Sequence, residues 1–103
     1  MKTEYIHALP AHWLNVSEVY KALGDDWRQK ILLLFEPNEE LTIKQIVDVL
    51  PLGRTSVTHH INVLLDAGLL LSRKQGREVF LSLNKHILLE MLERTRKYIE
   101  EES

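Results

Sequence analysis

The sequence predicts a small, mainly α-helical fold that carries one β-hairpin. Apolar residues recur at helical spacing from residue 14 to residue 67 and again from residue 85 to residue 101, and between these stretches positions 79, 81 and 83 follow the alternation of a strand. The chain has 103 residues, of which 45% are hydrophobic and 27% are charged. This composition suffices for one compact core, so we expect a single domain over residues 1–103.

Composition excludes several classes of function. The chain has no cysteine, which excludes disulfides, thiolate metal ligands and cysteine nucleophiles. It contains neither the roughly 20 consecutive apolar residues that a membrane span requires nor the pattern of a signal peptide. We therefore expect a cytoplasmic protein that does not enter a membrane. No Gly-rich phosphate loop and no cluster of acid, base and nucleophile is found, so we expect neither an enzyme nor a cofactor.

Helix signals come first along the chain. Before the hairpin we expect helices over residues 14–23, 27–35, 42–50 and 54–67. Asp25 or Asp26 can cap the second of these helices, and Thr42 with Gln45 forms the capping-box pattern at the start of the third. The third and fourth helices are separated only by a short turn that contains Gly53. Two short helices joined by such a turn are typical of a helix-turn-helix.

The hairpin follows immediately. Leu69–Ser72 is expected to be a strand, residues 73–77 a polar turn that contains glycine, and Val79–Leu83 the returning strand. The last helix is expected over residues 85–101, with Asn84 as its cap. A hairpin directly after a helix-turn-helix is the arrangement of a winged helix-turn-helix, so this is the fold that we predict.

The charge distribution is uneven. The net charge of −2 argues at first against a nucleic-acid partner. Residues 52–85, however, carry five Lys/Arg and only two Asp/Glu. Acidic residues are in excess on both sides: residues 1–51 carry five Lys/Arg and eight Asp/Glu, and residues 86–103 carry three Lys/Arg and five Asp/Glu. The helix-turn-helix and the hairpin therefore form a basic segment between acidic flanks.

These basic and polar side chains lie where a winged helix contacts double-stranded DNA. The second helix of the motif can enter the major groove, while the hairpin, or wing, reaches the backbone. The predicted base- and phosphate-contacting residues of the helix are Arg54, Thr55, Ser56, Thr58 and His59, and those of the wing are Arg73, Lys74 and Arg77.

Three motifs resemble the ArsR (ArsR/SmtB) family of bacterial winged-helix repressors. They are ALGDDWRQKIL at residues 22–32, VTHHINVLLDAGL at residues 57–69 and QGREVF at residues 75–80, and the likeness covers about residues 17–100. Trp27 departs from the small residue or proline of the family pattern. The resemblance implies a DNA-binding transcriptional repressor that is a homodimer through its first and last helices.

The apolar face of the last helix favours the same interface. This face is longer than one small domain easily covers, and pairing two copies would bury it. The predicted interface residues are Leu14, Ile87, Leu88, Met91, Leu92, Thr95, Tyr98 and Ile99. A twofold dimer is expected to bind a roughly palindromic operator.

The metal sites that the resemblance implies are not found. Thr42 and Lys44 stand where soft-metal sensors of the family have cysteines. In the last helix only His86 and Glu100 fit the zinc-site pattern, and a lysine ammonium at position 97 would repel a cation. We therefore predict no metal site.

Two alternatives stay open at this stage. One is a winged helix that binds proteins rather than specific DNA, since a fold does not fix a function. The other is a metal-responsive repressor with a non-standard site that uses His7, His12 or His86. No residue pattern identifies an inducer.

Overall fold

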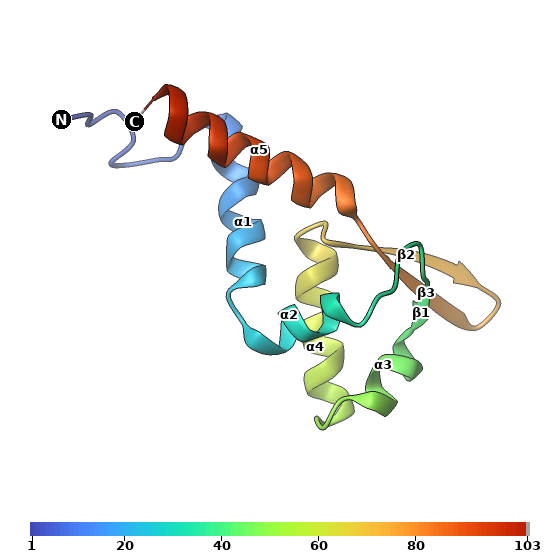
Figure 1. The fold of residues 1–103 in the computed structure, drawn as a ribbon. Coiled ribbons are helices and arrows are strands. Elements are labelled where there is room, and N and C mark those ends of the chain that lie inside the picture. Colours follow the sequence, from blue (N-terminus) through green and yellow to red (C-terminus); the bar gives the residue numbers. More distant parts are fainter. Residues whose placement is uncertain (103) are drawn as a thin grey trace.

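The computed structural model describes residues 1–102, including every side chain in this range except those of His12 and Leu14. The elements in chain order are η1 (Ala11–Trp13), α1 (Leu14–Leu23), α2 (Asp26–Leu33), β1 (Leu41–Thr42), α3 (Ile43–Val49), α4 (Arg54–Asp66), β2 (Leu70–Gln75), β3 (Glu78–Leu83) and α5 (Lys85–Glu101). The predicted winged helix-turn-helix is confirmed: α3 and α4 form the motif, and the β2–β3 hairpin follows it (Figure 1).

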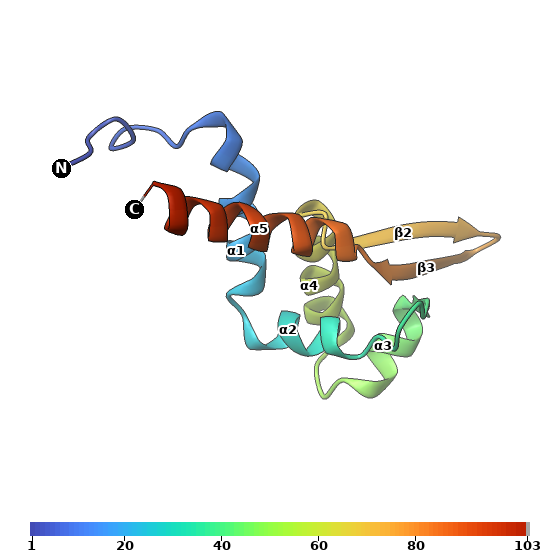
Figure 2. The same cartoon turned by 45° about the horizontal axis from the view of Figure 1, so that its top comes forward.

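One apolar core joins the helices to the sheet. Helices α1 and α4 each bury three residues at helical spacing in this core. Helices α2, α3 and α5 and strands β2 and β3 each bury one. The buried residues are Val16, Val19, Ala22, Ile31, Ile46, Val57, Ile61, Leu64, Leu69, Leu70, Leu81 and Met91. The hairpin projects from this body on the side opposite both chain ends (Figures 1 and 2).

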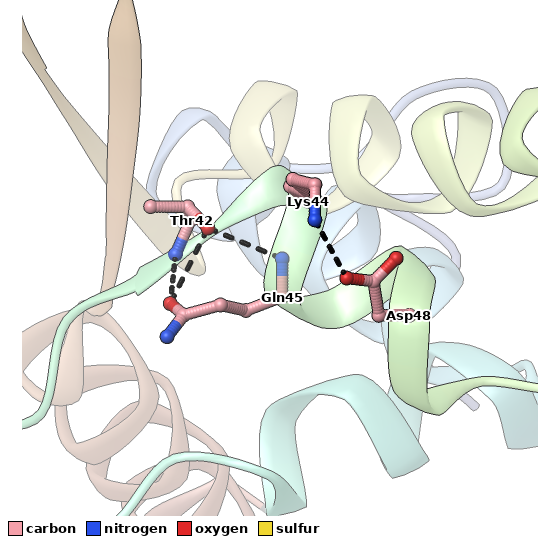
Figure 3. Close-up of polar contacts among 4 residues, drawn as sticks. All are labelled: Thr42, Lys44, Gln45 and Asp48. Carbon is pink, nitrogen blue, oxygen red and sulfur yellow. Dashed lines mark hydrogen bonds and ion pairs between the residues drawn. The ribbon is translucent and has the colours of Figure 1, made fainter.

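The caps of α2 and α3 form as the sequence predicts. The carboxylate of Asp25 accepts hydrogen bonds from the backbone N–H of Trp27 at 2.8 Å and of Arg28 at 3.2 Å. The Thr42 hydroxyl accepts from the backbone N–H of Gln45 at 3.1 Å, and the Gln45 side-chain oxygen accepts from the Thr42 N–H at 2.8 Å (Figure 3). This capping box satisfies two backbone donors at the start of the helix-turn-helix.

The sheet differs from the prediction in two ways. β2 continues through Gln75, so the predicted turn over residues 73–77 is wrong: the turn consists of Gly76 and Arg77 alone. Gly76 has a φ of 62°, which the first position of a type II′ turn requires. The short strand β1 was not predicted, and it pairs antiparallel with β3, giving the order β1-β3-β2 in the described part of the chain. Two residues are too few to show an alternating pattern.

Asn84 was predicted as the cap of α5, and this role is wrong. It occupies the N-cap position but, among the described residues, its side chain makes no capping hydrogen bond. Its amide instead donates to the carbonyl of Gly68 at 2.8 Å, and its backbone N–H donates to Leu69 at 3.0 Å. Asn84 therefore connects the start of α5 to the end of α4. The bounds of α5 itself, Lys85–Glu101, are as predicted.

The capping box gives a stability prediction. Thr42→Ala removes the hydroxyl acceptor and leaves a backbone N–H of α3 without its partner, so the free energy of unfolding should fall by about 1 kcal/mol. Urea denaturation followed by circular dichroism measures this change. Thr3→Ala alters an exposed threonine in the N-terminal segment and serves as the control. An unchanged urea midpoint for Thr42→Ala would contradict the role of the capping box.

Candidate nucleic-acid interface

Helix α4 has one buried and one exposed face. Val57, Ile61 and Leu64 are fully buried in the core, which fixes the orientation of the helix about its axis. The predicted contact residues on its N-terminal half are therefore turned outward. Arg54, Thr55, Ser56 and His59 are exposed, and Thr58 is half-buried. This end of α4 lies on the side of the molecule away from α5 (Figures 1 and 2).

The first turn of α4 attracts anions. Gly53 occupies the N-cap position, and within the described residues no side chain accepts a hydrogen bond there, so the first backbone N–H groups of the helix point outward. The first turn has no acidic residue and contains Arg54. The helix dipole, the open N–H groups and the guanidinium thus favour a negatively charged group at this end.

His59 and His60 have different surroundings although they are adjacent. His59 is exposed, whereas His60 is half-buried and its Nδ1 lies 3.3 Å from Nη1 of Arg28. The Arg28 guanidinium also donates to the backbone carbonyls of Ala22 at 2.7 Å and Lys21 at 3.3 Å. His60 therefore belongs to the packing between α4 and the α1–α2 junction, and His59 belongs to the exposed face.

The wing residues also differ from one another. Lys74 and Arg77 are exposed at the tip of the hairpin. Arg73 is also exposed, but its guanidinium is paired: its Nε and Nη2 donate to the two carboxylate oxygens of the exposed Glu40, both at 3.0 Å, and its Nη1 donates to Oε1 of Gln75 at 2.6 Å. The guanidinium also lies 4.7 Å from the ring centroid of Phe80.

Sequence reasoning missed Glu40. It precedes β1, and without that strand nothing in the sequence places it opposite the wing. The hydrogen bonds from Arg73, reinforced by the opposite charge, hold the pKa of the Glu40 carboxyl below its ordinary value, although partial burial acts against this shift. The same pairing raises the pKa of Arg73.

The predicted dimer residues have different surroundings. Met91, Ile87 and Leu88 pack on the chain's own core. Tyr98 packs on Trp13 with ring centroids 5.4 Å apart, and the Thr95 hydroxyl lies 2.8 Å from the Tyr20 hydroxyl of α1. Leu92 and Ile99 are 57% and 60% exposed. The side chain of Leu14 lies outside the described residues.

Comparison with known proteins agrees with this architecture. Residues 23–73 match a family described as a helix-turn-helix domain. The HTH-type transcriptional regulator YuzN of Bacillus subtilis is 39% identical over 84 residues, which cover 76% of this chain and 91% of that protein. The arsenical resistance operon repressor of Escherichia coli is 34% identical over 70 residues, covering 68% of this chain and 60% of the repressor.

A solved structure shows the same likeness. The ArsR-like transcriptional regulator of Rhodococcus sp. RHA1 superposes with a TM-score of 0.77 at 26% identity, covering 88% of this chain and 84% of that one. The chain belongs to the ArsR family of helix-turn-helix transcriptional regulators. The relatives of this ArsR-family chain are named as regulators rather than as enzymes, and its helix-turn-helix is the DNA-binding domain of such regulators.

The histidines considered as metal ligands are scattered in this ArsR-family protein. His7 is exposed in the N-terminal segment, and the side chain of His12 lies outside the described residues. His86 is exposed on α5, with its Nε2 3.6 Å from a carboxylate oxygen of Glu90. Among the described residues, no group of three or more His, Asp or Glu side chains could hold a metal ion. None of the described helices is long and apolar enough to span a membrane.

The lowered pKa of Glu40 gives a prediction for pH. A carboxyl whose pKa is lower in the folded state stabilises the fold above its ordinary pKa of 4.5 and loses this contribution as the pH falls through the folded-state value. Wild type should therefore lose more stability between pH 7 and pH 3 than Glu40→Gln does. Urea denaturation at the two pH values measures the difference. The control, Glu78→Gln, should lose as much as wild type, and equal losses in all three proteins would contradict the prediction.

Proposed function

We propose that this ArsR-family regulator is a repressor that binds a specific DNA sequence by inserting α4 into the major groove. The observation that carries the proposal is the exposed N-terminal half of α4. Arg54 can bind guanine through two hydrogen bonds, while the hydroxyls of Thr55, Ser56 and Thr58 suit bases or phosphates. The open N–H groups of the first turn suit a phosphate. His59 is exposed on the same half of the helix and completes the proposed surface.

The wing adds contacts that do not depend on sequence. Lys74 and Arg77 are exposed cations at the end of a hairpin that projects from the body, where they can reach the DNA backbone beside α4. Such contacts release counterions and make the affinity depend on salt concentration. They compensate locally for the net negative charge of the chain.

The proposed repressor is a homodimer joined through α1 and α5. Leu89, Leu92 and Ile99 on α5 are 66%, 57% and 60% exposed, and Tyr20 on α1 is 43% exposed. Exposed apolar side chains gathered on neighbouring elements favour burial by a partner. The radius of gyration, 16.1 Å, also exceeds the roughly 13 Å of a compact domain of about 100 residues, because the hairpin and α5 extend from the core.

A second copy is favoured as that partner because a twofold dimer presents two recognition helices to the two halves of a palindromic operator. One structure of the same fold, Mb0332 from Mycobacterium bovis, is described as a homodimeric winged helix-turn-helix DNA-binding domain; it has a TM-score of 0.69 and 20% identity to this chain. In this proposal residues 1–103 act as one cytoplasmic DNA-binding domain.

Arg54 tests the role of α4. Selection from a random DNA pool at low salt should enrich a sequence for the wild-type protein. Arg54→Ala should weaken binding to that duplex by about 1–3 kcal/mol and relax the preference at one position of each half-site. Lys74→Ala should weaken binding to all sequences and lower the salt slope by about one. Failure to enrich any sequence would instead favour a protein-interaction module.

Leu92 tests the dimer. Leu92→Glu places a charge in the proposed interface, where its burial is costly, so the variant should elute as a monomer in size-exclusion chromatography with light scattering. The control is Leu33→Glu, which changes a leucine at the end of α2 that is 83% exposed and belongs to neither α1 nor α5. This control should remain a dimer. A dimeric Leu92→Glu variant would contradict the proposed interface.

A further inference from the structure

The side chain of Arg73 crosses the wing sheet. Arg73 on β2 is paired with Phe80 on β3, and Phe80 is paired on its other side with Thr42 on β1. Neighbouring strands lie about 4.8 Å apart, so the row that these residues form is about 10 Å wide. The guanidinium lies over the Phe80 ring and ends at Glu40, two residues before Thr42. It therefore joins the outer strand of the wing to the opposite edge of the sheet.

The contact is directional as well as electrostatic. Two parallel N–H···O bonds from Arg73 to Glu40 fix the plane of the guanidinium, and the Phe80 ring below it restricts the same plane. The bond to Gln75 uses a third donor. Arg73, Lys74 and Arg77 are all exposed, but the charge of Arg73 is offset by Glu40, so Arg73 attracts a phosphate less strongly than the other two do.

Glu40 is connected to the helix-turn-helix. It is followed by β1 and then directly by α3, whose N-terminus is held by the Thr42–Gln45 capping box. Helix α3 in turn packs against α4 through the core. The Glu40–Arg73 pair thus links the projecting hairpin to the segment that carries the recognition helix, at a point outside the apolar core.

We propose that Glu40 and Arg73 are positioning residues that hold the wing at a fixed distance and angle from α4, and that Arg73 acts through this pair rather than through a phosphate. The inference rests on the proposed function, in which the wing and α4 contact the same DNA. It replaces the direct phosphate contact predicted from the sequence for Arg73, and it assigns a role to Glu40.

The two roles of Arg73 give opposite results for Glu40→Gln. If Arg73 binds phosphate, Glu40 competes with the DNA, so removing its charge should tighten binding and steepen the salt dependence. If the pair positions the wing, the same substitution should weaken binding to the specific duplex although it removes a negative charge. The sign of the change therefore distinguishes the roles.

The experiment measures affinity across a salt series for two duplexes, one selected by the wild-type protein and one of random sequence. Glu40→Gln and Arg73→Met should each weaken binding to the selected duplex roughly threefold to tenfold, with the wild-type salt slope and little change on the random duplex. The double variant should be no weaker than the weaker single variant. Glu78→Gln is the matched control, because it also removes one negative charge, from β3 of the hairpin, and leaves the Glu40–Arg73 pair intact. This control should not weaken binding.

Three results would overturn the proposal. They are tighter binding by Glu40→Gln, a salt slope lowered by about one in Arg73→Met, and equal losses on both duplexes, which would indicate reduced folding rather than altered positioning. Thermal unfolding of each variant accompanies the binding data.

A second measurement does not depend on DNA. Amide hydrogen exchange in β1 and the β2–β3 hairpin should be faster in Glu40→Gln than in Glu78→Gln, because the side-chain link from β2 to the segment before β1 is removed while the backbone pairing of β1 with β3 remains. Equal exchange in the two variants would overturn the proposal. If the wild-type protein binds neither duplex while Glu40→Gln speeds exchange, the proposed function fails and the link between wing and helix-turn-helix stands.

Discussion

Burial of one face of α4 is the constraint on which the rest of the structure depends. Val57, Ile61 and Leu64 occupy the centre of a core to which every other helix also contributes. When one face of a helix is fixed in the core, the residues on its opposite face are necessarily exposed. The polar residues at its N-terminal half are therefore presented at a defined angle by apolar packing, and no contact among the polar residues themselves is needed to orient them.

The sequence predicts most of this architecture because its helices follow strong and local rules. The ends of α1 and α5, the Asp25 cap and the Thr42–Gln45 capping box depend on residues within one turn of each other. The outward position of Arg54 and His59 follows from the same helical periodicity. These features need no knowledge of which segments meet in three dimensions.

Apart from the length of the hairpin turn, the features that sequence reasoning missed are contacts between distant segments. Glu40 and Arg73 are 33 residues apart, and Asn84 and Gly68 are 16 apart. The strand β1 is defined by its pairing with β3 rather than by its own two residues. Arg73 is an example: its place in a basic segment predicts a DNA contact, and only the structure shows that its guanidinium is also paired with Glu40. Local patterns thus locate a charged side chain, but only the tertiary structure shows whether its charge is available to a ligand.

The hydrogen bonds of Asn84 couple the position of α4 to that of α5. Its side chain and backbone both bond to the turn that ends α4, and Gly68 in that turn has a φ of 78° and lies against Ile87 of α5. These hydrogen bonds and this contact thus hold the end of α4 against the beginning of α5. In a dimer joined through α5, a small change in the angle between the two copies of α5 would move α4 with it. The displacement would be largest at the N-terminal end of α4, which is farthest from α5. In such a dimer, the contact between the two C-terminal helices would set the spacing between the two copies of α4.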